Sequence, residues 1–265
     1  MEMVAAAKLR RFQDMMQKSR AYTNGLETLL KRLSGGAFSD LHPFIKPREE
    51  KKVALVLIAS DAGLCGSYNN DLIHLAMKFV REQKSKPLVI GVGKSGITAL
   101  KAAGFECAYS FTDIRASRVE EILNELRDAL ETIYLGNKVD AIYAVYSHFK
   151  TLTAFKSTVE KLLPLERPAA DAKAADEARD YIFEPSPEAV FQKLIPQFFQ
   201  AKMRLVFLES VVSEQIARMT AMNQATKNAK EMIDGLVLKR NKARQASITK
   251  ELIEIVSGSQ ALKLK

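Results

Sequence analysis

The chain has 265 residues, a hydrophobic content of 47% and a formal net charge of +9. This length and composition supply enough apolar side chains for one large or two modest folded domains. Because no apolar run reaches about eighteen residues and no basic-then-apolar segment opens the chain, we expect neither a membrane span nor a secretory signal. Two cysteines and three scattered histidines offer no metal-ligand spacing, so we expect a reducing compartment, no metal and no cofactor.

The first 33 residues have the pattern of one amphipathic helix. Apolar and small side chains recur at alternating steps of four and three, which is the heptad spacing of a coiled coil. The residues of this N-terminal seam are Ala5, Leu9, Phe12, Met16, Ser19, Thr23, Leu26, Leu30 and Leu33. Gly35 and Gly36 then predict the end of the helix, with a loop as far as Pro47.

From Val53 the pattern changes to short apolar strands that alternate with helices. We predict strands at 53–58, 87–90 and 141–146 and an edge strand within 154–163. The helices are expected at 69–83, 95–103 and 118–135. Strands that alternate with helices are typical of a doubly wound, Rossmann-like α/β sheet.

Residues 166–181 are rich in alanine and charge, which predicts an exposed linker, and residues 181–183 could add a short strand. Ser186 and Pro187 then have the signature of a helix start. From Pro196 to Ser257 roughly sixty residues contain no further proline, which corresponds to a helix on the order of 90 Å long.

A second seam at heptad spacing runs along this long helix. Its residues are Leu208, Val212, Gln215, Met219, Met222, Thr226, Ala229, Ile233 and Leu236. We therefore predict that the two chain ends form an antiparallel two-helix coiled coil and that the α/β domain is attached to it. The predicted boundaries are 1–51 for the N-terminal helix and loop, 52–165 for the α/β domain, 166–187 for the linker and 188–265 for the C-terminal helix.

Two loops resemble catalytic or nucleotide-binding motifs. Gly91, Gly93 and Lys94 lie between a strand and a helix, as in a phosphate-binding loop, but the position of the first motif glycine holds Leu88. Cys65, in the loop after the first strand, has no base nearby in the sequence, so a structural or docking role is favoured over a catalytic thiol. A nucleotide-binding α/β enzyme with a coiled-coil appendage remains an alternative.

Basic residues gather on the N-terminal helix, where they could form a nucleic-acid-binding stripe. The cluster consists of Lys8, Arg10, Arg11, Lys18 and Arg20. Few aromatic side chains interleave with it and no groove-reading motif accompanies it, so a solvated or protein-facing surface is favoured. A basic nucleic-acid-binding coiled-coil protein is the remaining alternative.

Three stretches resemble the gamma subunit of F-type ATP synthases. These are residues 1–11 (MEMVAAAKLRR), residues 60–66 (SDAGLCG) and residues 241–258 (NKARQASITKELIEIVSG). The resemblance implies a non-catalytic central stalk, or rotor, whose coiled coil enters a ring of three alpha and three beta subunits. Its α/β domain is expected to contact the epsilon subunit and the membrane ring of c subunits, with no nucleic acid bound and with membrane contact only through the complex.

Carried over residue by residue, the resemblance implies a set of contacts with the alpha and beta ring. The expected contact residues are Met1, Arg218, Arg244, Gln245, Thr249, Glu251 and Glu254. Family members have further residues ahead of the position of Met1, so we expect this chain to lack the first helical turns. The cytoplasmic face of a bacterial inner membrane is the expected location, since the chain lacks the inserted cysteine pair of chloroplast relatives; the matrix side of the mitochondrial inner membrane is the alternative.

Overall fold

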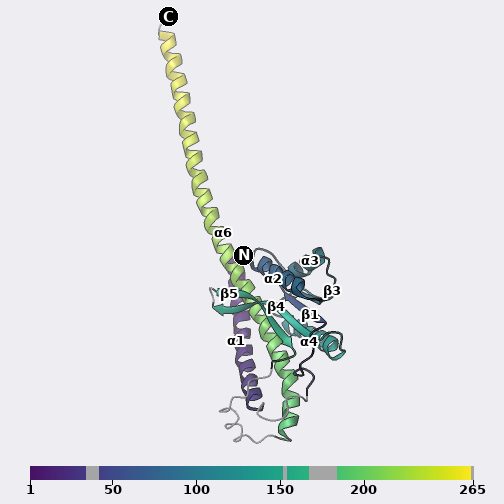
Figure 1. Cartoon of the computed structure of the whole chain (residues 1–265). Coiled ribbons are helices and arrows are strands. Elements are labelled where there is room, and N and C mark those ends of the chain that lie inside the picture. The colour runs from purple at the N-terminus through teal and green to yellow at the C-terminus, as the bar shows by residue number, and fades with distance from the viewer. Residues whose placement is uncertain (34–41, 152–153, 167–183, 264–265) are drawn as a thin grey trace. The chain divides into compact units, whose positions relative to one another are not determined.

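A computed structural model describes residues 1–33, 42–151, 154–166 and 184–263 of the chain (Figure 1). The chain divides into two compact units, Met1–Thr220 and Ala221–Lys265. The first unit contains the β-sheet, its helices and a coiled coil, and the second is a single helical stretch. The predicted linker and the possible strand at 181–183 lie mostly outside the described residues.

The sheet has five strands in the order β3-β2-β1-β4-β5. Strands β1 (Val53–Ile58), β2 (Leu88–Val92), β3 (Cys107–Phe111) and β4 (Ala141–Thr151) are parallel, and β5 (Ala154–Leu163) pairs with β4 in the antiparallel direction. The expected α/β fold is therefore confirmed, and the order reverses between β1 and β4. Strand β3 was not predicted, because only Phe111 of its five residues is buried and an apolar run is missing.

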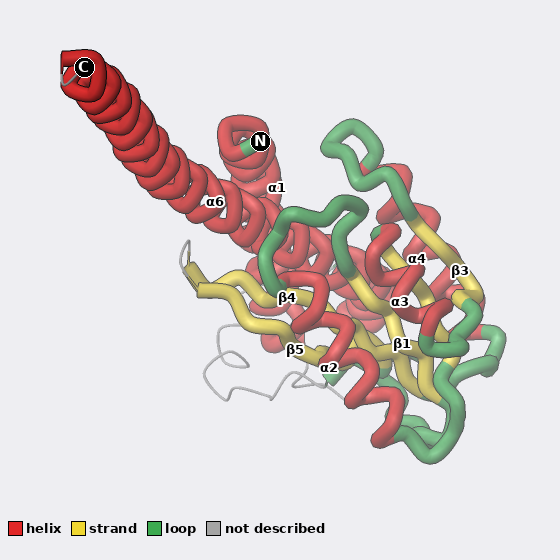
Figure 2. Tube along the Cα trace, turned by 90° about the horizontal axis from the view of Figure 1, so that it is seen from above, coloured by secondary structure: helices red, strands yellow, loops and turns green. Residues whose placement is uncertain are grey.

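Helices cover both faces of the sheet (Figure 2). Helices α2 (Tyr68–Glu82) and α3 (Lys94–Ala102) pack with Leu55 and Leu57 of β1. Helix α4 (Val119–Leu135) packs on the other face. Both faces are covered, which explains why all six residues of β1 are buried and why this strand is a continuous apolar run in the sequence.

The long helices α1 (Glu2–Leu33) and α6 (Pro187–Lys263) run antiparallel within the first unit. Arg20 contacts Glu209 at 2.7 Å, and the Thr23 hydroxyl lies 3.3 Å from the carbonyl oxygen of Ala201, so the order of contacts reverses along the two helices. The buried side chains of α1 are the nine that the heptad spacing predicted, from Ala5 to Leu33. The antiparallel coiled coil is thus confirmed.

The predicted seam on α6 is buried only in part. Leu208, Val212 and Gln215 are buried, whereas Ile233 and Leu236 are 59% and 58% exposed. Met219 and Met222 are half-buried, and Thr226 and Ala229 are exposed. The extension of the seam to Leu236 is therefore wrong in this chain, because the buried stripe of α1 begins at Ala5 and its residues pack on earlier turns of α6.

Candidate interaction surfaces

The carboxyl ends of β1 and β4 flank the point where the strand order reverses, which is where open α/β sheets usually bind ligands. Here helix α6 fills that position with Ser210 and Ser213. The Ser210 hydroxyl donates to the carbonyl oxygen of Ile58 at 3.2 Å, and the Ser213 hydroxyl donates to the carbonyl oxygen of Ser147 at 3.2 Å. The usual ligand crevice is therefore an internal contact between the sheet and α6.

Tyr68 strengthens the same contact from α2. Its hydroxyl lies 2.8 Å from the Ser210 hydroxyl and 2.9 Å from the Ser210 carbonyl oxygen. Burial raises the pKa of Tyr68 well above its usual value, so the phenol stays protonated as a donor. The sequence holds one signal of this contact. The polar residues Glu209, Ser210 and Ser213 interrupt an otherwise apolar stretch.

The loop that resembles a phosphate-binding motif has its backbone amides occupied. The amide of Gly93 donates to the carbonyl oxygen of Phe111 at 2.8 Å, that of Lys94 to the Asp61 carboxylate at 3.0 Å, and that of Ser95 to the carbonyl oxygen of Ser60 at 3.0 Å. A Cβ on Gly93 would lie 2.3 Å from the carbonyl oxygen of Ala59. The glycine is needed for this close approach, and the first amides of α3 are not free to bind a phosphate.

The loop at 60–66 holds its cysteine as a structural group. Cys65 is 2% exposed, and the Asn69 amide donates to its sulfur at 3.2 Å. Its other contacts are with the Ser60 hydroxyl and the Ala62 carbonyl oxygen, each at 3.9 Å. None of these three groups is a base that could activate the thiol, which supports the structural interpretation.

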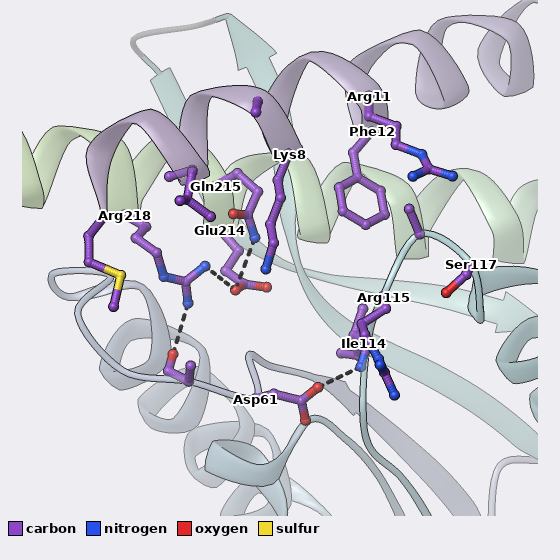
Figure 3. A pocket seen from close by; sticks show the side chains of 16 residues that line it. Lys8, Arg11, Phe12, Asp61, Ile114, Arg115, Ser117, Glu214, Gln215 and Arg218 are labelled. Carbon is purple, nitrogen blue, oxygen red and sulfur yellow. Dashed lines mark hydrogen bonds and ion pairs between the residues drawn. The ribbon is translucent and has the colours of Figure 1, made fainter.

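Arg218 fastens α6 to the same loop (Figure 3). Its guanidinium donates to the carbonyl oxygens of Ala62 at 2.9 Å and Gly63 at 3.4 Å, and it forms an ion pair with Glu214 at 2.5 Å. Burial raises the pKa of Glu214, while Arg218 acts in the opposite direction. In this chain the Arg218 side chain, which is 13% exposed, is engaged within the first unit.

A buried carboxylate joins three elements of the first unit. Glu209 on α6 is 3% exposed, and it contacts Arg20 of α1 and Nδ1 of His148 on β4, each at 2.7 Å. A buried carboxylate is tolerated when charged and hydrogen-bonding partners surround it, as they do here. Glu209 therefore links the coiled coil to the sheet.

The second unit is a helical stretch whose side chains face outward. Every described side chain from Asn223 to Ser259 is exposed, although many are large and apolar. The exposed apolar residues are Met232, Ile233, Leu236, Val237, Leu238, Ile248, Leu252, Ile253, Ile255 and Val256. An exposed apolar surface of this extent marks an interaction site.

Five of the predicted contact residues lie on this stretch and are exposed: Arg244, Gln245, Thr249, Glu251 and Glu254. Two of them make local side-chain contacts, with Lys250 3.9 Å from Glu254 and the Ser247 hydroxyl 3.4 Å from Glu251. Met1, on the first unit, is 79% exposed. Apart from Arg218, the predicted contact residues are thus accessible, and their contact with a ring remains a prediction.

At about 100° per residue, the two sides of the helix differ in character over residues 244–256. Arg244, Glu251 and Glu254 fall within an arc of about 80°. The apolar residues Ile248, Ile253, Ile255, Leu252 and Val256 occupy an adjoining arc of about 160°. Over residues 244–256 the helix therefore presents a charged side and an apolar side, whereas the earlier apolar residues Ile233 and Leu236 fall in the same arc as the charged group.

The described residues contain no group of three or more histidine, cysteine, aspartate or glutamate side chains that could hold a metal ion. Among the helices that the structure describes, none is both long and apolar enough to cross a membrane.

Comparisons with known proteins identify the family. A family model described as ATP synthase matches residues 1–262. The ATP synthase gamma chain of Moorella thermoacetica is 41% identical over 263 residues, which cover 99% of this chain and 92% of that protein. The gamma chain of Chlorobaculum tepidum is 38% identical over 270 residues, with the same two coverages.

Solved structures share the fold. A chain of the Tetrahymena thermophila mitochondrial ATP synthase, in a structure of the central stalk and c-ring, matches with a TM-score of 0.63 and 23% identity, covering 85% of this chain and 97% of that one. A chain of the Euglena gracilis mitochondrial ATP synthase matches with a TM-score of 0.60 and 16% identity, covering 97% and 95%. Because these sequence matches extend over nearly its whole length, the chain belongs to the ATP synthase gamma-chain family.

Proposed function

We propose that the helical stretch from Ala221 onward is the part of the rotor that a ring of three alpha and three beta subunits surrounds. The chain is the rotor subunit of an F-type ATP synthase and is non-catalytic. The observation that carries the proposal is the complete exposure of Asn223–Ser259, including ten large apolar side chains. Helices in proteins gain most of their stability from packing, and an exposed apolar surface of this size marks an interaction site, so a partner is expected to cover it.

The difference between the two sides of this helix supports a coupling mechanism. Three identical catalytic subunits placed around it would meet the charged arc, the apolar arc and the boundary between them. A protein shifts toward the conformation that makes the better contacts with its ligand, so the three sites would adopt different nucleotide affinities. Rotation of the helix would then exchange these states among the three subunits.

Within this mechanism we assign the ring contacts to Met1, Arg218, Arg244, Gln245, Thr249, Glu251 and Glu254. Arg244 and Gln245 are the sharpest test, because they are neighbours on the exposed stretch and belong to different arcs. Arg218 is the exception in the set: its contacts with Ala62 and Gly63 give it a structural role, so its substitution would also loosen the first unit.

The test is the double substitution Arg244→Ala with Gln245→Ala in the reconstituted complex. Losing these two ring contacts should lower ATP-driven proton pumping relative to ATP hydrolysis, while the thermal unfolding of the isolated chain stays nearly unchanged. The matched control is Arg240→Ala with Asn241→Ala, one helical turn earlier on the same exposed stretch. A large loss of stability in the isolated chain, or equal coupling losses in both double variants, would contradict the assignment.

For the first unit we propose contacts with the epsilon subunit and the c-ring. The solved relatives include assemblies described as central stalk with c-ring and as a rotor, which supports this part. The chain is a peripheral part of the synthase, and we propose the cytoplasmic face of a bacterial inner membrane as its location. Protease accessibility in inverted membrane vesicles tests the side: the subunit should be cleaved in inverted vesicles and protected in right-side-out ones.

A further inference from the structure

We infer that a cavity in the first unit binds a small amphipathic organic anion that has an apolar ring body and one hydrogen-bond donor. The cavity has a volume of about 670 Å³ and lies between helices α1 and α6 and the loops that follow β1 and β3 (Figure 3). This volume falls within the range of small-molecule sites, which is roughly 300 to 1,000 Å³. Of the seven proposed ring contacts, Met1 and Arg218 line this cavity, and the other five lie on the exposed stretch.

The walls of the cavity are mostly apolar. Side chains from both long helices and from the loop after β3 contribute to this lining. The apolar residues include Val4, Ala5, Phe12, Ile114 and Ala116. An aromatic or alicyclic body is therefore the part of a ligand that this lining would hold.

Several polar groups of the lining already have partners within the chain. Asp61 accepts hydrogen bonds from the amides of Lys94 at 3.0 Å and Ile114 at 2.6 Å. Glu214 is paired with Arg218, whose guanidinium also binds the loop at 62–63. These groups shape the cavity but have little capacity left for a ligand.

Gln215 is the exception, because its amide oxygen lacks a partner among the described residues. The residue is 4% exposed and lines the cavity, and its amide nitrogen donates to Glu214 at 3.2 Å, which fixes the orientation of the amide. Its oxygen is buried without a hydrogen-bond partner in the described part of the chain. An unsatisfied buried acceptor costs about 1–3 kcal/mol, so a small side-chain movement that turned this oxygen toward the cavity would let a ligand that donates one N–H or O–H recover that free energy.

The charge of the lining favours an anion. Four cationic residues, Lys8, Arg11, Arg115 and Arg218, line the cavity against two acidic ones, Asp61 and Glu214. Arg218 is engaged by Glu214, and Arg115 pairs with Asp113. Lys8 and Arg11 form no ion pair in the described parts of the chain, although the charge of Lys8 acts to lower the pKa of Glu214, and both side chains are exposed on α1. An acidic group on the ligand would therefore meet these two cations.

The probe for the test is 8-anilinonaphthalene-1-sulfonate, which combines an aromatic body, one N–H donor and a sulfonate. The chain contains no tryptophan, so a single introduced tryptophan reports where the probe binds. Ser117→Trp places the reporter in the cavity lining, and Leu238→Trp places a control reporter on the exposed helical stretch. Quenching of each tryptophan is titrated in the full chain.

We expect saturable quenching at Ser117→Trp with one probe per chain, and weak, non-saturable quenching at Leu238→Trp. In the Ser117→Trp background, Lys8→Met or Arg11→Met should weaken binding roughly fivefold, which corresponds to the loss of one charge contact worth about 1 kcal/mol. Arg10→Met, the neighbour of Arg11 that does not line the cavity, should leave the affinity unchanged. The uncharged N-phenyl-1-naphthylamine should bind with lower affinity and should not respond to Lys8→Met.

Gln215→Met removes the unpartnered oxygen at similar side-chain volume and should also lower the affinity for the sulfonate probe. Because Gln215 is buried, the fold of this variant is checked by circular dichroism, and the surface variants at Lys8 and Arg11 test the proposal if it does not fold. Equal quenching at both tryptophan positions would overturn the inference. So would an affinity that is unchanged in both Lys8→Met and Arg11→Met.

Discussion

Two stretches of the same helix α6 have opposite surroundings. All twelve side chains from Val206 to Ala217 are buried, including Glu209 and Gln215, whereas every described side chain from Asn223 to Ser259 is exposed. The first stretch packs between the sheet and α1 and is part of the folded core, and no described residue buries the apolar side of the second. The comparison shows that the helical period of apolar residues identifies a contact surface but does not tell which partner covers it.

The largest effect should come from matched leucine truncations in the two stretches. Leu208→Ala removes a fully buried side chain and should destabilise the first unit by about 2–5 kcal/mol. Leu236→Ala, at a residue that is 58% exposed, should change stability by no more than about 0.5 kcal/mol. Chemical denaturation of the isolated chain measures both, and similar values would mean that the exposed stretch is covered in solution.

Glycine substitutions give the next largest contrast. Gly93 has a φ of +88° and sits against the carbonyl oxygen of Ala59, so Gly93→Ala should destabilise the fold by about 1–3 kcal/mol. Gly235 lies in the exposed helix, and a Cβ added there would meet no atom within 4 Å, so Gly235→Ala should stabilise the helix by up to about 1 kcal/mol. Thermal unfolding followed by far-ultraviolet circular dichroism should show a lower melting temperature for Gly93→Ala and a higher one for Gly235→Ala. A higher melting temperature for Gly93→Ala would contradict the close approach of Gly93 to the carbonyl oxygen of Ala59.

A smaller effect is expected from the contact between Tyr68 and Ser210. Tyr68→Phe removes a buried hydroxyl and should cost about 1–2 kcal/mol, because the Ser210 carbonyl oxygen loses its donor and the Ser210 hydroxyl loses a neighbour at 2.8 Å. Tyr22→Phe is the control, since Tyr22 is 55% exposed and its substitution should be nearly neutral. The midpoint of chemical denaturation is measured for both variants. Equal midpoints would show that the contact between Tyr68 and Ser210 contributes nothing to stability.

The smallest effect concerns pH. Burial raises the pKa of Glu214 in the folded chain, so the folded state holds this proton more tightly than the unfolded state. The contribution of Glu214 to stability should therefore decrease as the pH rises from 4.5, the ordinary value, through the raised pKa, and should stay constant above it. The melting temperatures of the wild type and Glu214→Gln are measured as a function of pH, and the wild type minus variant difference should decrease over this range. A difference that does not change with pH would contradict the prediction.

The sequence predicted α1 well because only one side of that helix is buried, so its nine buried residues stand out at heptad spacing. On α6 the same reasoning found the buried residues Leu208, Val212 and Gln215 but gave an incomplete account of the helix. The stretch from Val206 to Ala217 is buried on all sides, which removes the period, and the seam residues Ile233 and Leu236 keep the period although no described residue covers them. Strand β3 was missed because four of its five residues are not buried.

For the site, the loops at 60–66 and 91–95 were found in the sequence, and a structural or docking role was favoured for the first, but the contacts that the two loops make were not predicted. That Asp61 and Ser60 occupy the first amides of α3 depends on residues more than thirty positions apart, which local patterns do not reveal. The cavity and its unpartnered Gln215 oxygen likewise arise only when α1, α6 and two loops meet. Such tertiary contacts require the folded chain.

The carboxylate of Glu209 has a mechanical consequence for a subunit that must carry torque. One oxygen contacts Arg20 on one helix of the coil, and the other contacts His148 on a strand, while the residue itself belongs to the second helix. A rotation of the sheet relative to either helix would therefore strain the contact of Glu209 with Arg20 or its contact with His148. The Glu209 contacts therefore resist relative motion of the two helices and the sheet within the first unit.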